Sequence, residues 1–185
     1  MKIKKALLFP VAILLLGFIV PQRAVIPVQG ASPRDWNAQS FWYAPWGISG
    51  VHKGIDIFAR KGTPVLAATQ GVVLFQGEIA LGGRVIAILG PKWRVHYYAH
   101  LDSARVQAGK LLSTATMIGT VGDSGNAVGK PPHLHYAVVS LLPYPGRWDR
   151  TLQGWKKMFF LDPAQVLSAS LKNPSPGQAT PPIGK

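Results

Sequence analysis

Residues 50–73 read GVHKGIDIFARKGTPVLAATQGVV and show the pattern that runs through the middle of the chain. From about Phe41 to Ser140, short segments rich in valine, isoleucine and tyrosine are separated by glycine or proline, and none shows a sustained helical period. This pattern predicts short β-strands joined by turns. The segments expected to form strands are Val65–Ala68, Val72–Gln76, Arg84–Leu89, Arg94–Leu101, Met117–Val121 and Leu134–Ser140.

These segments predict an all-β domain, a compact antiparallel sheet of the sandwich or barrel type. Gly82 and Gly83 lie between two of the predicted strands and indicate a hairpin turn. Residues 143–167 are rich in aromatic side chains, so we expect them to cap the sheet, with a short helix after Pro163. Trp46 and the aromatic residues just before it are expected either in the core or in the wall of a cleft.

The start of the chain predicts an export segment with an apolar helix. Lys2, Lys4 and Lys5 precede the run Ala6–Val20, which is uncharged and almost wholly apolar. A complete membrane span usually needs about 20 apolar residues, so the run is short for one. A signal peptide cleaved near Gly30 and a retained membrane anchor both remain open. Either would place the protein outside the cytoplasm, in the cell envelope or periplasm.

The sequence divides into three predicted parts. Residues 1–30 form the signal peptide or anchor, and residues 31–170 form the folded domain. Residues 171–185 are rich in proline and glycine and have little to bury, which predicts a disordered tail. We expect the domain to be a monomer.

Composition excludes several kinds of site. The 185 residues contain no cysteine, which rules out disulfides, thiolate metal sites and cysteine nucleophiles. Glu78 is the only glutamate and lies outside any H-E-x-x-H motif, which excludes that type of zinc peptidase. The formal net charge of +13 indicates either a solvated basic surface or attraction to anionic envelope polymers or to a membrane surface. Export argues against nucleic acid as a partner.

The histidines form patterns that strand geometry makes meaningful. Residues of equal parity share one face of a strand, so His133 and His135 should lie on the same side. By the same rule, His96, Tyr98 and His100 should share a face.

A zinc site fits these patterns. Catalytic zinc takes three protein ligands and keeps one position for water, and histidine and aspartate are suitable ligands. Asp56 follows His52 by four residues, which makes a compact pair. One of His133 and His135 would complete the set.

Three stretches resemble the lysostaphin/LytM-type zinc metallopeptidases, which cleave peptide bonds in bacterial peptidoglycan. They are Gly50–Val73, His96–Asp102 (HYYAHLD) and Gly122–Val139 (GDSGNAVGKPPHLHYAVV). The resemblance implies the duplicated hybrid motif fold of that family, an antiparallel β domain with a long groove. It also implies zinc as cofactor, peptidoglycan as partner and hydrolysis as the reaction.

The resemblance further implies a role for five side chains. The zinc ligands would be His52, Asp56 and His135. The two other active-site histidines would be His100 and His133, one acting as general base and one or both stabilising the oxyanion. His96 matches no family position, and we interpret it as structural or cleft-lining. Ser124 and Asn126 could contact the substrate or simply hold a turn.

We therefore expect a zinc-dependent endopeptidase that acts on peptidoglycan. Stem-peptide cross-links are favoured over oligoglycine bridges because the short chain carries no obvious wall-targeting domain. The amide bond to muramic acid remains a third candidate, and a protein substrate is a further one. The alternative from another class is a non-catalytic cell-wall-binding or hydrolase-activating module of the same fold. Relatives of that kind lack ligands, whereas all five positions are filled here.

Overall fold

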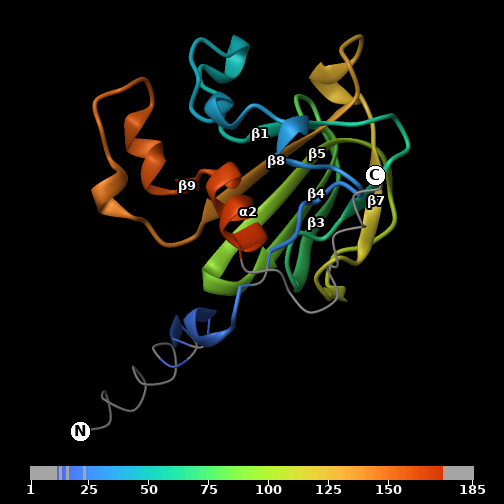
Figure 1. The fold of residues 1–185 in the computed structure, drawn as a ribbon. Helices are drawn as coiled ribbons and strands as arrows, with labels where there is room; N and C mark the ends of the chain where they lie inside the picture. The colour runs from blue at the N-terminus through green and yellow to red at the C-terminus, as the bar shows by residue number, and fades with distance from the viewer. Residues whose placement is uncertain (1–11, 13, 16, 23, 173–185) are drawn as a thin grey trace, which may run out of the picture.

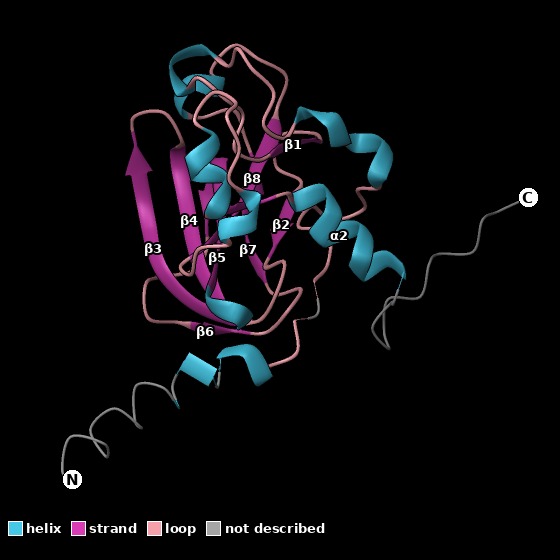
Figure 2. Cartoon of the chain, turned by 90° about the vertical axis from the view of Figure 1, so that its left-hand side faces the viewer, coloured by secondary structure: helices cyan, strands magenta, loops and turns pink. Residues whose placement is uncertain are grey.

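The computed structural model describes residues 12, 14–15, 17–22 and 24–172. These residues form one nine-stranded sheet with short 3₁₀ turns around it and a helix near the end (Figures 1 and 2). The elements are β1 (Ile55–Phe58), β2 (Pro64–Leu66), β3 (Gly71–Ile79), β4 (Gly83–Gly90), β5 (Arg94–Ala104), β6 (Leu111–Leu112), β7 (Met117–Val121), β8 (His133–Ser140), β9 (Phe160–Leu161) and α2 (Pro163–Lys172).

All the strand pairs are antiparallel, and the predicted fold class is confirmed. The main strand order is β1-β8-β5-β4-β3-β6, and β7 pairs with both β5 and β2. The long strand β5 therefore pairs with three neighbours. The predicted hairpin joins β3 to β4, and the predicted short helix is α2. Strand β1 was not expected, and neither were the two-residue strands β6 and β9.

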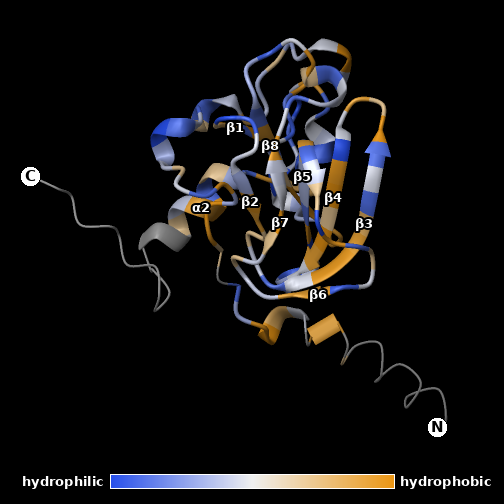
Figure 3. Ribbon diagram, turned by 90° about the vertical axis from the view of Figure 1, so that its right-hand side faces the viewer, coloured by the Kyte–Doolittle hydropathy of each residue, from blue (hydrophilic) through white to orange (hydrophobic). Residues whose placement is uncertain are grey.

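The central strands have a core face and an open face. On β8, Leu134, Tyr136 and Val138 are each 0% exposed and belong to the hydrophobic core. His133 and His135 alternate with them and line a groove on the opposite face. The prediction that these two histidines share one side is therefore confirmed. Hydrophobic residues lie along much of β4 and β7 and in the loop between β3 and β4 (Figure 3).

Residues 24–29 pack against the domain. Val28 is 2% exposed, belongs to the core and forms an antiparallel bridge with Val65 of β2. The backbone N–H of Val25 donates to the carbonyl of Ala68 at 2.8 Å. The sequence predicts that the folded domain starts after residue 30. The segment just before that boundary covers β2. No helix among the described residues is long and apolar enough to cross a membrane. Most of the predicted export segment, and the predicted tail beyond residue 172, lie outside the described residues.

A pair of deletions tests the importance of this packing. Removing residues 1–31 should lower the free energy of unfolding by about 2 kcal/mol or more relative to removing residues 1–23, because Val28 leaves the core. Urea unfolding followed by tryptophan fluorescence measures the difference. Equal stability of the two shortened chains would show that residues 24–31 contribute nothing to the domain.

His96 lies on the core face, away from the groove, so it is structural. It is 0% exposed, and its Nδ1 lies 2.6 Å from the hydroxyl of Tyr136. The hydroxyl of the neighbouring Tyr98 accepts a hydrogen bond from the backbone N–H of Ala68 at 2.8 Å. Burial, with a smaller contribution from the charge of Arg94, lowers the pKa of His96 to about 3. Folding therefore requires this imidazole to be neutral.

His96 should make stability depend on acid. Below its unfolded pKa of about 6.5, the unfolded chain binds a proton that the folded chain refuses, so stability falls as pH falls from about 6.5 toward 3. The slope attributable to this residue is at most about 1.4 kcal/mol per pH unit. The variant His96→Leu/Tyr136→Phe removes both polar partners and should flatten that part of the profile. Urea unfolding at pH 7.5, 6 and 5 measures it, and parallel profiles for both proteins would contradict the assignment.

Candidate metal centre

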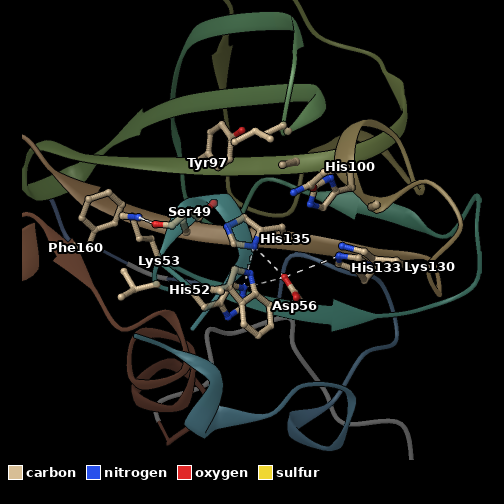
Figure 4. Close-up of a pocket in the computed structure, with 18 of the residues that line it drawn as sticks. Ser49, His52, Lys53, Asp56, Tyr97, His100, Lys130, His133, His135 and Phe160 are labelled. Carbon is tan, nitrogen blue, oxygen red and sulfur yellow. Dashed lines mark hydrogen bonds and ion pairs between the residues drawn. The ribbon is translucent and has the colours of Figure 1, made fainter. Parts of the chain in front are cut away.

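Three side chains with metal-binding atoms meet in the groove (Figure 4). Nε2 of His52 lies 3.1 Å from Oδ1 of Asp56 and 3.2 Å from Nδ1 of His135, and the last two atoms are 2.8 Å apart. Ligand atoms in a tetrahedral zinc site with bonds of about 2.0–2.1 Å are separated by roughly 3.3 Å. Among the described residues, His52, Asp56 and His135 form a group of three side chains whose metal-binding atoms lie close enough together to hold one ion.

Strand pairing brings two of these side chains together. In the register of β1 with β8, Asp56 lies opposite His135, and in the register of β8 with β5, His135 lies opposite Ala99. The three residues therefore form one row across three strands, on the open face. A small residue at position 99 leaves room beside the His135 ring. The carboxylate and the imidazole meet because opposite residues in an antiparallel pair are about 4.5–5.5 Å apart.

His52 reaches the site from the loop before β1. Its backbone exchanges hydrogen bonds with the preceding aromatic segment: His52 N–H donates to Tyr43, and Trp42 N–H donates to His52. Its Nδ1 lies 3.1 Å from the carbonyl of Ser40, and because a carbonyl can only accept, Nδ1 carries the proton. Nε2 therefore presents a lone pair to the site. Trp46 stacks on the ring, with centroids 4.1 Å apart. Trp46 thus forms the wall of the cleft, one of its two predicted locations.

The charges of the site suit a cation. Burial alone would raise the pKa of the Asp56 carboxyl group, but the hydrogen bonds and charges of His135 and His52 outweigh burial and hold that pKa well below its usual range. Burial lowers the pKa of His135 despite the opposing effect of Asp56. Asp56 is therefore a carboxylate and His135 favours the neutral form. One carboxylate with two imidazoles is a ligand set that zinc accepts, so these residues fit the ion.

His100 faces the groove because β5 is irregular at this position. Its φ is +62°, in the left-handed region, and the pairing of β5 with β4 shifts register between Arg84 and Ile86, opposite this point. The prediction that His100 shares a face with His96 and Tyr98 is therefore wrong. The bulge reverses the alternation, as bulges near functional sites commonly do.

His100 and His133 are oriented in the same way. Nδ1 of His100 donates to the carbonyl of Ser124 at 2.9 Å, and Nδ1 of His133 donates to the carbonyl of Pro131 at 2.7 Å. The Nε2 atom of each ring is left without a proton while the ring is neutral. Burial lowers the pKa of His100 to about 4, against the effect of the Ser124 carbonyl, so the ring is neutral at pH 7. The two ring centroids are 5.0 Å apart, and Nε2 of His133 lies 4.0 Å from Oδ1 of Asp56.

The loop that orients His100 is held by a close contact between two glycines. Gly83 and Gly125 both have positive φ, and a Cβ on Gly125 would meet the backbone nitrogen of Gly83 at 2.2 Å. Nearby, the hydroxyl of Ser124 donates to the carbonyl of Leu101 at 2.9 Å. Ser124 therefore holds the turn and, through its carbonyl, positions the His100 ring, whereas Asn126 lines the groove.

The groove has a volume of about 780 Å³, and residues that line it lie on both sides of the metal-binding cluster (Figure 4). Several of its lining side chains were not predicted from the sequence. Tyr97 was overlooked, although it precedes the buried Tyr98 on β5 and therefore faces the opposite side of the sheet. Lys53 was overlooked although it directly follows His52. Lys130 and Phe160, which also line the groove, lie in segments whose sequence carries no comparable signal.

The chain matches known proteins over the region that holds this cluster. It is 36% identical over 135 residues to the L-Ala–D-Glu endopeptidase of Bacillus subtilis (strain 168), covering 63% of this chain and 41% of that protein. It is 35% identical over 111 residues to the peptidoglycan DD-endopeptidase ShyC of Vibrio cholerae, covering 57% and 25%. The chain thus spans about two fifths or less of the length of these relatives.

Solved structures share the fold. The catalytic domain of lysostaphin from Staphylococcus simulans superposes with a TM-score of 0.58 at 24% identity, covering 75% of this chain and 98% of that one. A lytM protein from Ruminococcus gnavus superposes with a TM-score of 0.57 at 26% identity, covering 74% and 54%.

The profile of Peptidase family M23 matches residues 50–142, just over half of the chain. This range contains His52, Asp56, His100, His133 and His135. The chain therefore belongs to peptidase family M23.

Proposed function

We propose that this protein is a zinc-dependent endopeptidase that hydrolyses peptide bonds in bacterial peptidoglycan. The observation that carries the proposal is the cluster of His52, Asp56 and His135 in a groove beside the imidazoles of His100 and His133. Membership of a peptidase family and relatives named as endopeptidases support a hydrolase. The L-Ala–D-Glu endopeptidase and the DD-endopeptidase favour a stem-peptide bond, whereas the lytM neighbour is described as a glycyl-glycine endopeptidase.

Zinc would be held by Nε2 of His52, the carboxylate of Asp56 and Nδ1 of His135. A bound zinc ion polarises a carbonyl group and lowers the pKa of a bound water molecule to about 7. The protein's part at His52 is to keep Nε2 unprotonated. The Ser40 carbonyl does so for His52, because it accepts the proton on the other ring nitrogen.

His100 and His133 would move protons. Nε2 of either ring can accept the proton of an attacking water molecule, and once protonated it can donate to the oxygen or nitrogen that gains charge. Their Nδ1 protons are engaged with Ser124 and Pro131, so both rings are held with Nε2 toward the groove. Asp56 would serve only as a ligand, and no glutamate lines the groove.

The substrate requires an exported protein. The basic composition, with a net charge of +13, suits an anionic envelope, and the apolar run Ala6–Val20 suits export or anchoring. We therefore propose a location in the cell envelope.

Substitutions should separate zinc binding from turnover. Replacing His52, Asp56 or His135 by alanine should abolish stoichiometric zinc, because two ligands remain. Replacing His100 or His133 by alanine should keep zinc and lower kcat about 10²- to 10⁴-fold. Zinc is measured by mass spectrometry of the dialysed protein, and circular dichroism checks the fold. Loss of zinc in His133→Ala as severe as in His135→Ala would contradict the ligand assignment.

Digestion of purified cross-linked peptidoglycan tests the function itself. The full chain, kept in mild detergent and loaded with zinc, should release fragments with new peptide termini, and their masses name the bond. A matched sample treated with chelator should release none. If folded, zinc-loaded protein cleaves nothing, the endopeptidase proposal fails and a non-catalytic wall-binding or activating module becomes the better account.

A further inference from the structure

Lys53 is a cation without a carboxylate partner among the described residues. Its Nζ donates to the carbonyl of Ser49 at 2.9 Å, and it makes no ion pair. The side chain is half-buried in the wall of the groove. Lysines in protein interiors usually pair with a carboxylate, because a partly desolvated charge left alone is unfavourable.

The seven acidic side chains of the protein are engaged elsewhere. Asp56 is in the metal-binding cluster, and among the described residues it is the only carboxylate that lines the groove. The others pair with bases or hold turns: Asp102 and Asp123 contact Lys61, Glu78 contacts Arg84, Asp149 contacts Lys157, Asp35 contacts Ser32 and Asp162 accepts from Ala164. None of them can neutralise Lys53 without a rearrangement.

The neighbourhood of Lys53 strengthens its need for an anion. A second cation, Lys156, lies close enough to interact with its positive charge. Lys156 itself donates to the side chain of Gln153 and lies over the ring of Trp155. Two cations near each other, with one of them opening into the groove, create a site of positive potential.

The position of Lys53 relates it to the reacting bond. It directly follows His52, so its Cα is about 3.8 Å from that of a proposed zinc ligand. Figure 4 shows its ammonium group beside Ser49 and Phe160, on the opposite side of the cluster from His133 and Lys130. A peptide lying along the groove across the cluster would therefore pass Lys53 on one side of the cluster and His133 and Lys130 on the other.

We propose that Lys53 binds a free carboxylate of the substrate, close to the cleaved bond. The protein would then select anionic stem peptides over amidated or uncharged peptides such as oligoglycine. This inference rests on the proposed endopeptidase function and adds a substrate class to it. The neutral Ser49 carbonyl holds the ammonium group in place, and an incoming carboxylate supplies the missing countercharge.

The test compares two synthetic stem peptides that contain the bond identified by the peptidoglycan digestion. They differ only in carrying a carboxylate or a carboxamide on the residue nearest that bond. The zinc-loaded full chain should cleave the carboxylate form with a kcat/KM about 10-fold higher or more, mainly through KM, as expected for a charge-assisted hydrogen bond in a partly exposed site.

Variants assign the preference to Lys53. Lys53→Met should reduce the ratio of the two kcat/KM values to about 1, and Lys53→Arg should retain most of it. Lys110→Met is the matched control, because it removes an exposed lysine that does not line the groove, and it should keep the preference. Calorimetric binding of both peptides to the zinc-loaded variant His100→Ala provides a readout that does not depend on turnover.

The outcomes separate the two proposals. If the natural protein cleaves neither peptide, the endopeptidase function fails and this inference fails with it. If it cleaves both equally well, the function stands and the inference is overturned. If Lys53→Met slows both peptides equally, Lys53 only holds the Ser49 loop, and the inference is again overturned. It is also overturned if Lys130→Met, rather than Lys53→Met, removes the preference.

Discussion

The pairing of β8 between β1 and β5 is the constraint on which the site depends. Because side chains alternate along a strand, a slip of one residue would exchange His135 with its neighbours Leu134 and Tyr136. Both neighbours are 0% exposed in the core, so a slip would bury an imidazole and expose two large side chains. The hydrophobic core thus sets the register, and the register brings Asp56 opposite His135. The stability of the domain and the geometry of the metal-binding cluster have the same physical cause.

The two remaining histidines are held in different ways, because His133 begins the regular strand β8 whereas His100 depends on a departure from regular structure. His100 reaches the groove through a bulge with a positive φ, and His133 is turned by the carbonyl of Pro131 in the loop before β8. Such irregularities are unfavourable by themselves and need surrounding contacts to persist. For His100 these contacts are the backbone bond from its N–H to Gly82 and the Ser124 carbonyl on its ring. The hairpin and the glycine loop therefore hold a side chain that the sheet alone would turn away.

Much of this organisation could be predicted where the structure is regular. The side of β8 that carries His133 and His135 followed from alternation, since β8 has no bulge. The same rule failed at His100, because one inserted residue reverses parity and nothing in HYYAHLD reveals the insertion. Strands β6 and β9 have two residues each, too few for an alternating pattern. Residues 24–29 were assigned to the export segment, because an apolar run before a domain has the same sequence pattern whether it belongs to an export segment or packs against the domain. Lys53 was missed because its significance lies in the absence of a partner, which only three-dimensional structure reveals.

The central claim is that one zinc ion is held by two imidazoles and one carboxylate, while His100 and His133 stay free. X-ray absorption at the zinc edge of the loaded full chain measures this directly. The account predicts nitrogen and oxygen neighbours at about 2.0–2.2 Å, with the multiple-scattering signal of two imidazole rings. A signal from three or four imidazole rings would mean that His100 or His133 binds the metal, and it would contradict the division of the five side chains proposed for this site.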